Sequence, residues 1–266
     1  MFNIIKSLNY SARRDTVNWI TIVSLLGMPL FVSFISGMLN PDSMQKMTSS
    51  AYFASQNMAT VFIFLCVGIM IFASKLMASD AADKTINYEF TAGHSRNEIF
   101  AGRVIAGFVW GAVLVYVIML IPIGAFELIY GWGLETSKSN VLLRCALCFF
   151  PIIRLCAYNM MLASLARSAG KGIALGYASF NVVAILSNVL DELAHIKLVY
   201  SFGFTNVSNL LISENSFSRV INGKTVTVFD TAVTDEMIWK TIVYSLIFTA
   251  IYLLITFINF KKTDRD

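Results

Sequence analysis

Four cysteines and two histidines are the residues of this sequence that could hold a metal ion or carry a redox reaction. Cys145 and Cys148 form a Cys-x-x-Cys pair, but both lie in an apolar run and no second pair completes a metal site. Glu192 and His195 have an i, i+3 spacing that can share a metal on a helix, although one such pair is a weak signal. The pattern favours small packing residues at the cysteines and predicts no metal or cofactor bound by this chain.

Motifs for phosphate binding and for nucleophilic catalysis are incomplete. Gly170-Lys171-Gly172 lacks the upstream glycine and the following Ser or Thr of a phosphate-binding loop. Gly93-His94-Ser95 lacks the closing glycine of a nucleophile elbow. An intramembrane hydrolase would need paired acids or a nucleophile at depth, and the apolar runs contain no acidic residue at depth. We therefore expect no catalytic residues in this chain.

The composition indicates the environment in which these residues must be positioned. Of the 266 residues, 57% are hydrophobic and 14% are charged, whereas a soluble domain has roughly 45–50% and about 25%. A domain of this size cannot bury so much apolar surface, which excludes a soluble enzyme, a disordered chain and a disulfide-rich secreted scaffold. The net charge of +4 is too small to indicate nucleic-acid binding. The sequence predicts a multi-pass membrane protein.

Charge-free apolar runs predict six transmembrane helices, because a helix needs roughly 20 apolar residues to cross a bilayer. The spans are expected at about 18–39, 54–75, 104–126, 145–166, 172–190 and 239–260. Arg154 interrupts the fourth run, but the pieces on either side of it are too short to cross alone. The predicted fold class is an all-α integral membrane protein, with residues 1–266 forming a single transmembrane domain.

Basic residues beside the spans predict the orientation. With the N-terminus inside, twelve Lys and Arg residues flank the inner ends of the spans and seven flank the outer ends. Both termini are therefore expected in the cytoplasm, with the protein in the cell membrane. Residues 1–17 mix apolar side chains with Lys6, Arg13 and Arg14, which predicts an amphipathic helix along the inner interface. A frayed basic tail is the alternative.

The inner connection at residues 76–103 is longer than a simple crossing needs. Asp80 or Ser79 can cap a short helix that ends at Gly93, and Ser95 with Glu98 three residues later forms a capping-box pattern. The connection carries charges of both signs. We expect two helical pieces that form a docking surface for a cytoplasmic partner, with a solvated loop as the alternative.

The outer connection at residues 191–238 is also long. Its apolar stretch, 198–212, is too short to span and suits a re-entrant or interfacial segment. Asn222-Gly223 follows between β-branched residues, which is a strong hairpin signal. The outer face is therefore expected to carry a small structured cap.

Arg154 is the one charged residue near the middle of a predicted span. Such residues face a protein interior or a wet cavity. Asn181, about midway along the fifth span, or carbonyls freed by Pro151 could accept its hydrogen bonds. Three roles stay open at this stage: lining of a translocation route, a subunit contact, or a structural interhelical network.

This arrangement resembles the membrane subunit of ABC-2-type ABC transporters, a group of bacterial multi-subunit exporters. The resemblance covers nearly the whole chain and is sharpest in the inner connection, where the acidic and polar run Asp83–Glu89 precedes the turn Gly93–Arg96 and Glu98. The family often has Gly-Thr after the acidic residue and a proline at the turn, where this chain has Lys84-Thr85 and Gly93.

The resemblance implies a permease without its own ATPase site. Two copies, or this chain and a paralogue, would form the channel in the lipid bilayer, and separate ATPase subunits would bind ATP and Mg below. The inner connection would act as a coupling helix. The residues implied to contact the ATPase are Asp80, Asp83, Lys84, Thr85, Tyr88, Glu89 and Arg96. The apolar lining would suit export of an amphipathic peptide, antibiotic or lipid-like cargo by alternating access.

Two other functions are compatible with the predicted spans. A non-transporting immunity or sensor subunit would share the fold without stimulating an ATPase. An ion-coupled secondary transporter would usually place carboxylates at depth and show broken helices in repeated halves, and the sequence has neither.

Overall fold

Long apolar helices make up most of the chain, as its composition predicts. The computed structural model describes residues 2–39, 48–54, 57–83, 92–196, 198–212, 216–221, 224–229 and 233–262. The elements are α1 (Phe2–Arg14), α2 (Thr16–Leu39), α4 (Ser49–Ala54), α5 (Asn57–Asp83), α7 (Arg96–Tyr130), α8 (Lys138–Leu147), α9 (Phe149–Ala166), α10 (Ala169–Ala194), α11 (Gly203–Leu211), β1 (Ser216–Ile221), β2 (Lys224–Phe229) and α12 (Asp235–Lys262).

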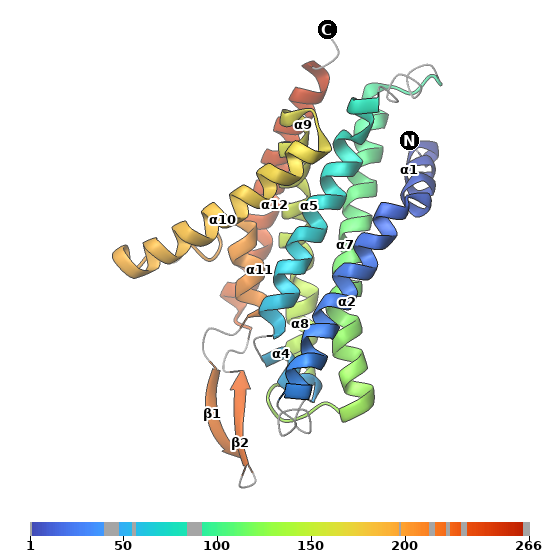
Figure 1. Cartoon of the computed structure of the whole chain (residues 1–266). Coiled ribbons are helices and arrows are strands. Elements are labelled where there is room, and N and C mark those ends of the chain that lie inside the picture. The colour runs from blue at the N-terminus through green and yellow to red at the C-terminus, as the bar shows by residue number, and fades with distance from the viewer. Residues whose placement is uncertain are drawn as a thin grey trace.

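Helices cover most of each of the six predicted spans. Among the described residues, five helical stretches are long and apolar enough to cross a membrane: Met58–Ala78, Arg96–Tyr130, Lys138–Ala166, Ala169–Ala194 and Asp235–Lys262. The remaining predicted span lies in α2, which has 24 residues and runs along the bundle to the end where α4 lies (Figure 1). The all-α membrane fold is confirmed, and the sixth crossing stays a prediction.

Proline and capping residues explain where the long helices bend and begin. α8 ends at Leu147, one turn before Pro151. Proline has no N–H to donate to the carbonyl four residues back, and its ring crowds that carbonyl, so the helix breaks there. α7 begins at Arg96, before the predicted span, because Ser95 caps it. Cys148 keeps an α-helical backbone, and α9 continues close to the direction of α8.

The two ends of the bundle differ in what they carry (Figure 1). Both termini, the end of α5, the start of α7 and the turn from α9 to α10 lie at one end. The hairpin β1–β2 and the short helix α4 lie at the other end. A chain that crosses a membrane an even number of times has both termini on the same side, as this arrangement has. We call the end with the termini the inner end and the end with the hairpin the outer end.

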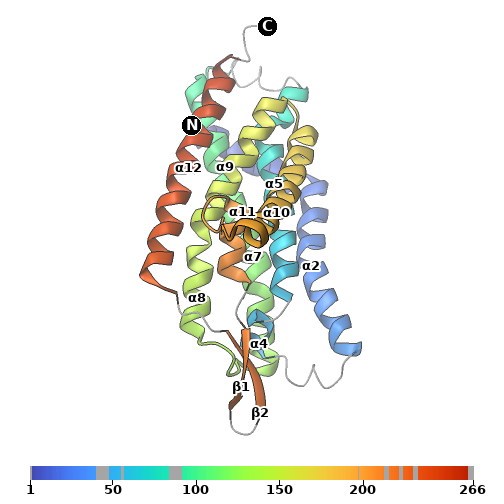
Figure 2. The ribbon, with the colours of Figure 1, turned by 90° about the vertical axis from the view of Figure 1, so that its left-hand side faces the viewer.

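The core lies where α5, α7 and α9 pack together. Leu65 and Ile69 of α5, Ile118 of α7 and Ile152 of α9 are fully buried. α10 is different: it leans away from the bundle toward its C-terminal end, and most of its surface is exposed (Figure 1). Seen from the side to which α10 leans, α2 and α12 form the two edges of the bundle (Figure 2).

The apolar stretch at 198–212 contains α11, a nine-residue helix. Phe204, Val207 and Leu210 of α11 are buried against the neighbouring helices, so the segment lies inside the bundle rather than on its surface. This position fits the re-entrant alternative. A helix pairs the backbone groups of its middle internally, whereas the carbonyls of its last turn need partners from elsewhere when a short helix is buried.

The hairpin expected at Asn222-Gly223 has both of its strands. β1 and β2 pair antiparallel, with Ile221 opposite Lys224, so two residues connect them. Those two residues lie outside the described part of the chain. The connection length is the one for which Asn-Gly is the preferred turn sequence.

Candidate functional site

The predicted coupling residues fall at the inner end, and the structure describes only part of them. The predicted helix start at Asp80 is wrong, because α5 continues through Asp80 to Asp83. The side chains of both residues are outside the described part of the chain. The other four residues of the central run, Lys84, Thr85, Tyr88 and Glu89, lie outside the described residues altogether. Their contact with an ATPase therefore stays a prediction.

The second half of the inner connection forms the expected helix start. Ser95 Oγ accepts from the Glu98 backbone N–H at 3.3 Å, and the Glu98 carboxylate accepts from the Ser95 N–H at 3.1 Å. This is the reciprocal capping box that the sequence predicts. Gly93 has a positive φ of 82°, which suits the predicted glycine break. α7 therefore begins at a defined residue beside the connection.

Arg96, another predicted coupling residue, is exposed in the first turn of α7. Its Nη1 donates to the Lys261 carbonyl at 3.4 Å, at the C-terminal end of α12. A cation at a helix C-terminus is favourable, because it meets the carbonyls that have no partner within the helix. Arg96 thus joins the start of α7 to the end of α12 while its surface remains accessible.

Arg103 makes a buried contact that the sequence did not reveal. It lies on α7 with 1% of its surface exposed, and its Nη1 donates to the Met77 carbonyl of α5 at 3.4 Å. The bond links the two helices on either side of the inner connection. In the sequence, Arg103 is one of several basic residues beside a span, and the type of residue alone does not distinguish a buried arginine from a solvated one.

A second polar contact holds the elbow between α1 and α2 against α5. Lys75 forms an ion pair with Asp15 and also donates to Asn18 Oδ1 at 3.0 Å. Asn18 in turn donates to the Ala12 carbonyl at 3.1 Å. The elbow is therefore attached to α5 about two turns before Asp83.

α1 has the two faces that an interfacial helix needs. Ile4 is 2% exposed and packs beside Gly102 of α7, where an added Cβ would lie 2.9 Å from Ile4 Cγ2. Lys6, Arg13 and Arg14 are exposed on the rest of the helix. This segregation of apolar and basic residues is the one predicted for residues 1–17.

The predicted pairing of Arg154 with Asn181 is wrong. Asn181 is exposed on α10 and donates to the Tyr177 carbonyl of its own helix at 2.8 Å. Arg154 is 1% exposed on α9, where it faces the turn before α11 and α12 instead. Sequence position gives the depth of two residues, but not the faces that their helices turn toward each other.

Arg154 holds the turn that leads into α11. Its Nη1 donates to the Tyr200 carbonyl at 3.0 Å and its Nη2 donates to the Ser201 carbonyl. The guanidinium also lies over the Phe248 ring of α12, 4.2 Å from the ring centre. The acceptors are carbonyls, as the sequence allowed, but they belong to the re-entrant segment and not to the helix broken by Pro151.

Arg144 holds the other end of α11. It is 1% exposed, and its Nη1 donates to the Leu210 carbonyl at 3.1 Å and to the Asn209 carbonyl at 3.4 Å. Its Nε donates to Asn140 Oδ1 at 3.3 Å. The sequence placed Arg144 among the outer flanking charges, so this role was missed. The two arginines of α8 and α9 together fix the re-entrant helix at both ends.

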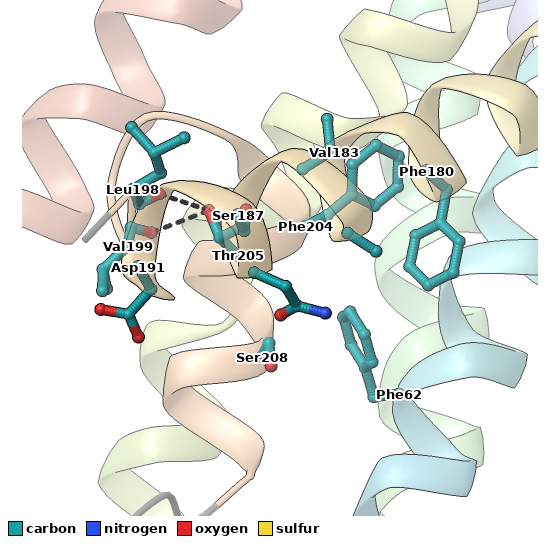
Figure 3. Close-up of a pocket in the computed structure, with 12 residues that line it drawn as sticks. Phe62, Phe180, Val183, Ser187, Asp191, Leu198, Val199, Phe204, Thr205 and Ser208 are labelled. Carbon is teal, nitrogen blue, oxygen red and sulfur yellow. Dashed lines mark hydrogen bonds between the residues drawn. The ribbon is translucent and has the colours of Figure 1, made fainter. Parts of the chain in front are cut away.

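A cavity of about 220 Å³ lies between α5, α10 and α11 (Figure 3). Three phenylalanines line one end, and Asp191 lies at the other end. The cavity lies outside the set of residues that the sequence singled out. The sequence feature that could have indicated the cavity is the face of α10 that lines it, because this face becomes more polar toward the C-terminal end of the helix.

The four cysteines are free thiols buried among apolar side chains. Among the described residues, no group of three or more His, Cys, Asp or Glu side chains comes close enough to hold a metal ion. The Cys145-x-x-Cys148 pair lies on the α8 face that packs into the core. These positions fit the packing role proposed for them.

The geometry thus presents a multi-pass bundle with a charged inner connection, linked inner helix ends and a re-entrant helix near the outer end. No curated protein matches the chain in a sequence search. The family model described as ABC-2 family transporter protein matches residues 11–265, almost the whole chain. Members of this family are membrane transport components that have no ATPase site of their own. The chain belongs to the ABC-2 family of transporter proteins.

Proposed function

We propose that this chain is the permease subunit of an ATP-driven ABC exporter and that separate subunits bind ATP and Mg. Family membership supports a permease, and the links among helices at the inner end support coupling through residues 76–103, which we call the coupling segment. Arg103 bonds to the Met77 carbonyl, and Lys75 pairs with Asp15. A push on the coupling segment therefore acts on α5 and α7 together.

The burial of Arg103 is the observation that carries this proposal furthest. If the bond between Arg103 and the Met77 carbonyl broke, the guanidinium and the carbonyl would lose this hydrogen bond while still buried, which costs free energy in an apolar surrounding. The inner ends of α5 and α7 consequently move as one unit. Closure of an ATPase pair below the membrane would then shift both helices as rigid elements and switch the access of the pathway.

The docking surface in this proposal consists of residues of the coupling segment. Its members are Asp80, Asp83, Lys84, Thr85, Tyr88, Glu89 and Arg96. The excess of basic residues at the end with both termini supports a cytoplasmic location for this surface, with the chain in the cell membrane. Surrounding lipid would cover the apolar outer faces of the helices.

A second permease, either a copy of this chain or a paralogue, would complete the pathway. The exposed side of α10, which includes the apolar residues Val182 and Ile185 and the polar residue Asn181, is the surface proposed for that contact. Apolar side chains exposed along a helix that leans from its own bundle need a protein or lipid neighbour. Arg154 would act on the pathway indirectly, by positioning α11. The proposed cargo is an amphipathic peptide, antibiotic or lipid-like molecule.

The test is purification of the tagged full chain from its native membrane, followed by identification of its companions. The proposal expects a stoichiometric partner with a phosphate-binding loop whose ATP hydrolysis depends on this chain. Charge reversal by Asp83→Lys or Glu89→Lys should lower that hydrolysis, while Asp235→Lys at the outer end should leave it unchanged. A folded chain that arrives alone and stimulates no ATPase would favour the immunity or sensor subunit or the secondary transporter.

A further inference from the structure

The cavity beside α10 has a graded lining. The positions of α10 that face it are Phe180, Val183, Ala184, Ser187, Asn188 and Asp191. They repeat at i, i+3, i+4, i+7, i+8 and i+11, so they form one face of the helix. Polarity rises along this face from a phenyl ring to a carboxylate over about 16 Å of helix. We call the cavity with this face the α10 groove.

The apolar end of the α10 groove is an aromatic cluster built from three elements. Phe180 of α10 lies 5.2 Å from Phe204 of α11 and 5.8 Å from Phe62 of α5, measured between ring centres. All three rings line the cavity, and Figure 3 shows them gathered away from Asp191. Such a cluster binds aromatic or alkyl groups, and the faces of its rings also attract cations.

The polar end of the α10 groove has hydrogen-bonding groups that are still unused. Ser187 Oγ is inaccessible and has no hydrogen-bond partner among the residues that the structure describes. Within the same described part of the chain, Asp191 forms no ion pair. The Asp191 carboxylate, with the Ser187 hydroxyl and the Asn188 amide on the same helix face, suits a ligand that brings a positive charge.

The wall opposite α10 is fixed before any ligand arrives. The Thr205 hydroxyl, which has one proton to donate, lies within hydrogen-bond distance of the carbonyls of Leu198, Val199 and Phe202, at 2.8, 3.1 and 2.8 Å. Leu198 and Val199 line the groove (Figure 3). Arg154 holds the next two carbonyls of the same turn. A wall held in this way needs little ordering on binding, which favours affinity.

We propose that the α10 groove binds an amphipathic cation, with its aromatic or alkyl part among Phe62, Phe180 and Phe204 and its positive group at Asp191. The proposal rests on the permease function, because it assigns the class of cargo to a site in the permease. The graded lining selects orientation as well as charge, since reversal would separate the positive group from the Asp191 carboxylate and place the apolar part beside that carboxylate.

Binding to the full chain in lipid nanodiscs tests this proposal. The probe is tritiated 4-phenylbutyl-trimethylammonium, measured by scintillation proximity with empty nanodiscs as the partition control. Its uncharged tert-butyl isostere serves as a competitor. We expect saturable binding that the isostere displaces at least about fivefold less well than the unlabelled cation. Equal displacement by the two compounds would overturn the selection of charge.

Matched variants locate the two ends of the ligand. Asp191→Asn should weaken binding about fivefold, whereas Glu192→Gln, the adjacent acid that does not line the groove, should leave it unchanged. Phe180→Leu should weaken binding of the phenyl compound, while Phe31→Leu, on the exposed side of α2, should not. Equal losses in the matched variants would contradict the assignment, as would no loss in either, provided that size-exclusion profiles show folded protein.

The binding assay needs no ATPase, so the two proposals fail separately. Charge-selective binding by a chain that stimulates no ATPase would retain the groove and reject the permease mechanism. An assembly whose ATP hydrolysis depends on this chain, but whose groove binds the cation and its isostere equally, would retain the permease and reject this class of cargo.

Discussion

The surroundings of α11 and the inner end of the bundle use similar polar groups in different environments. Around α11, Arg144 and Arg154 are each 1% exposed and bond to backbone carbonyls. At the inner end, Lys75 with Asp15 and the Ser95 cap are partly open to solvent. A buried charge must keep its partners, whereas exposed partners exchange with water at low cost. The first region is therefore built to stay fixed, and the second can rearrange.

Arg103 is the exception to this difference between the two regions. It lies at the inner end, yet it is as buried as the arginines around α11. Its bond to Met77 joins α5 to α7, while the exposed contacts nearby attach α1 and α12. The difference indicates which contacts stay intact when the inner end moves. α5 and α7 remain joined, and the helices at the periphery adjust.

Replacement of Arg154 should give the largest effect on stability. Arg154→Gln removes donors to the carbonyls of Tyr200 and Ser201 and the contact with the Phe248 ring. We expect a loss of about 2–5 kcal/mol, because two buried carbonyls lose their donors. Thermal unfolding and hydrogen exchange of residues 198–212 would measure it. Unchanged protection of that segment would mean that Arg154 does not hold α11.

Lysine substitutions separate the roles of the two arginines around α11. Arg144 lies at the C-terminal end of α11, where the carbonyls favour any cation, so Arg144→Lys should cost only about 1 kcal/mol. Arg154→Lys should cost more, because one ammonium group cannot serve two carbonyls and stack on a ring as a planar guanidinium does. Equal melting temperatures for the two lysine variants would contradict this distinction.

Removal of the cap of α7 should have a smaller and local effect. Ser95→Ala deletes the acceptor for the Glu98 N–H, which typically costs about 1 kcal/mol. Faster hydrogen exchange should be confined to the first turn of α7. Ser137→Ala, which removes the equivalent cap of α8 at the outer end, is the matched control for transport activity. If both variants lowered transport equally, the inner end would have no special role.

The weakest effect is expected at the elbow of α1 and α2. Lys75→Gln removes the ion pair with Asp15, and a partly exposed pair contributes about 0–1 kcal/mol. A double-mutant cycle with Asp15→Asn would measure the coupling energy between the two side chains. A coupling energy as large as the effect of Arg154→Gln would show that the elbow belongs with the fixed region.

Local patterns explain most of what the sequence predicted correctly. The apolar runs have the length of a span, and helices cover most of each predicted span. The Ser95 and Glu98 pair located the start of α7, and Asn222-Gly223 located the hairpin, because both signals act over two to three residues. The resemblance to the family rested on the order of spans and connections along the chain, and that order can be read from the sequence without knowledge of tertiary contacts.

Tertiary contacts explain what the sequence could not predict. Arg103, Arg144 and Arg154 bond to carbonyls that lie 26, 66 and 46 residues away in sequence. Any residue offers a carbonyl, so residue types give no signal of such a partner. The lean of α10 likewise left Asn181 exposed and opened the groove at Asp191, and no local pattern records the tilt of a helix.

Photo-crosslinking at the coupling segment tests the central claim most directly. A photoreactive phenylalanine analogue in place of Tyr88 should crosslink, in native membranes, to a protein that contains a phosphate-binding loop. The same analogue in place of the exposed Trp239 at the start of α12 should not crosslink to that protein. Crosslinking to such a protein from Trp239 but not from Tyr88 would contradict the proposed coupling surface, as would crosslinking from neither position.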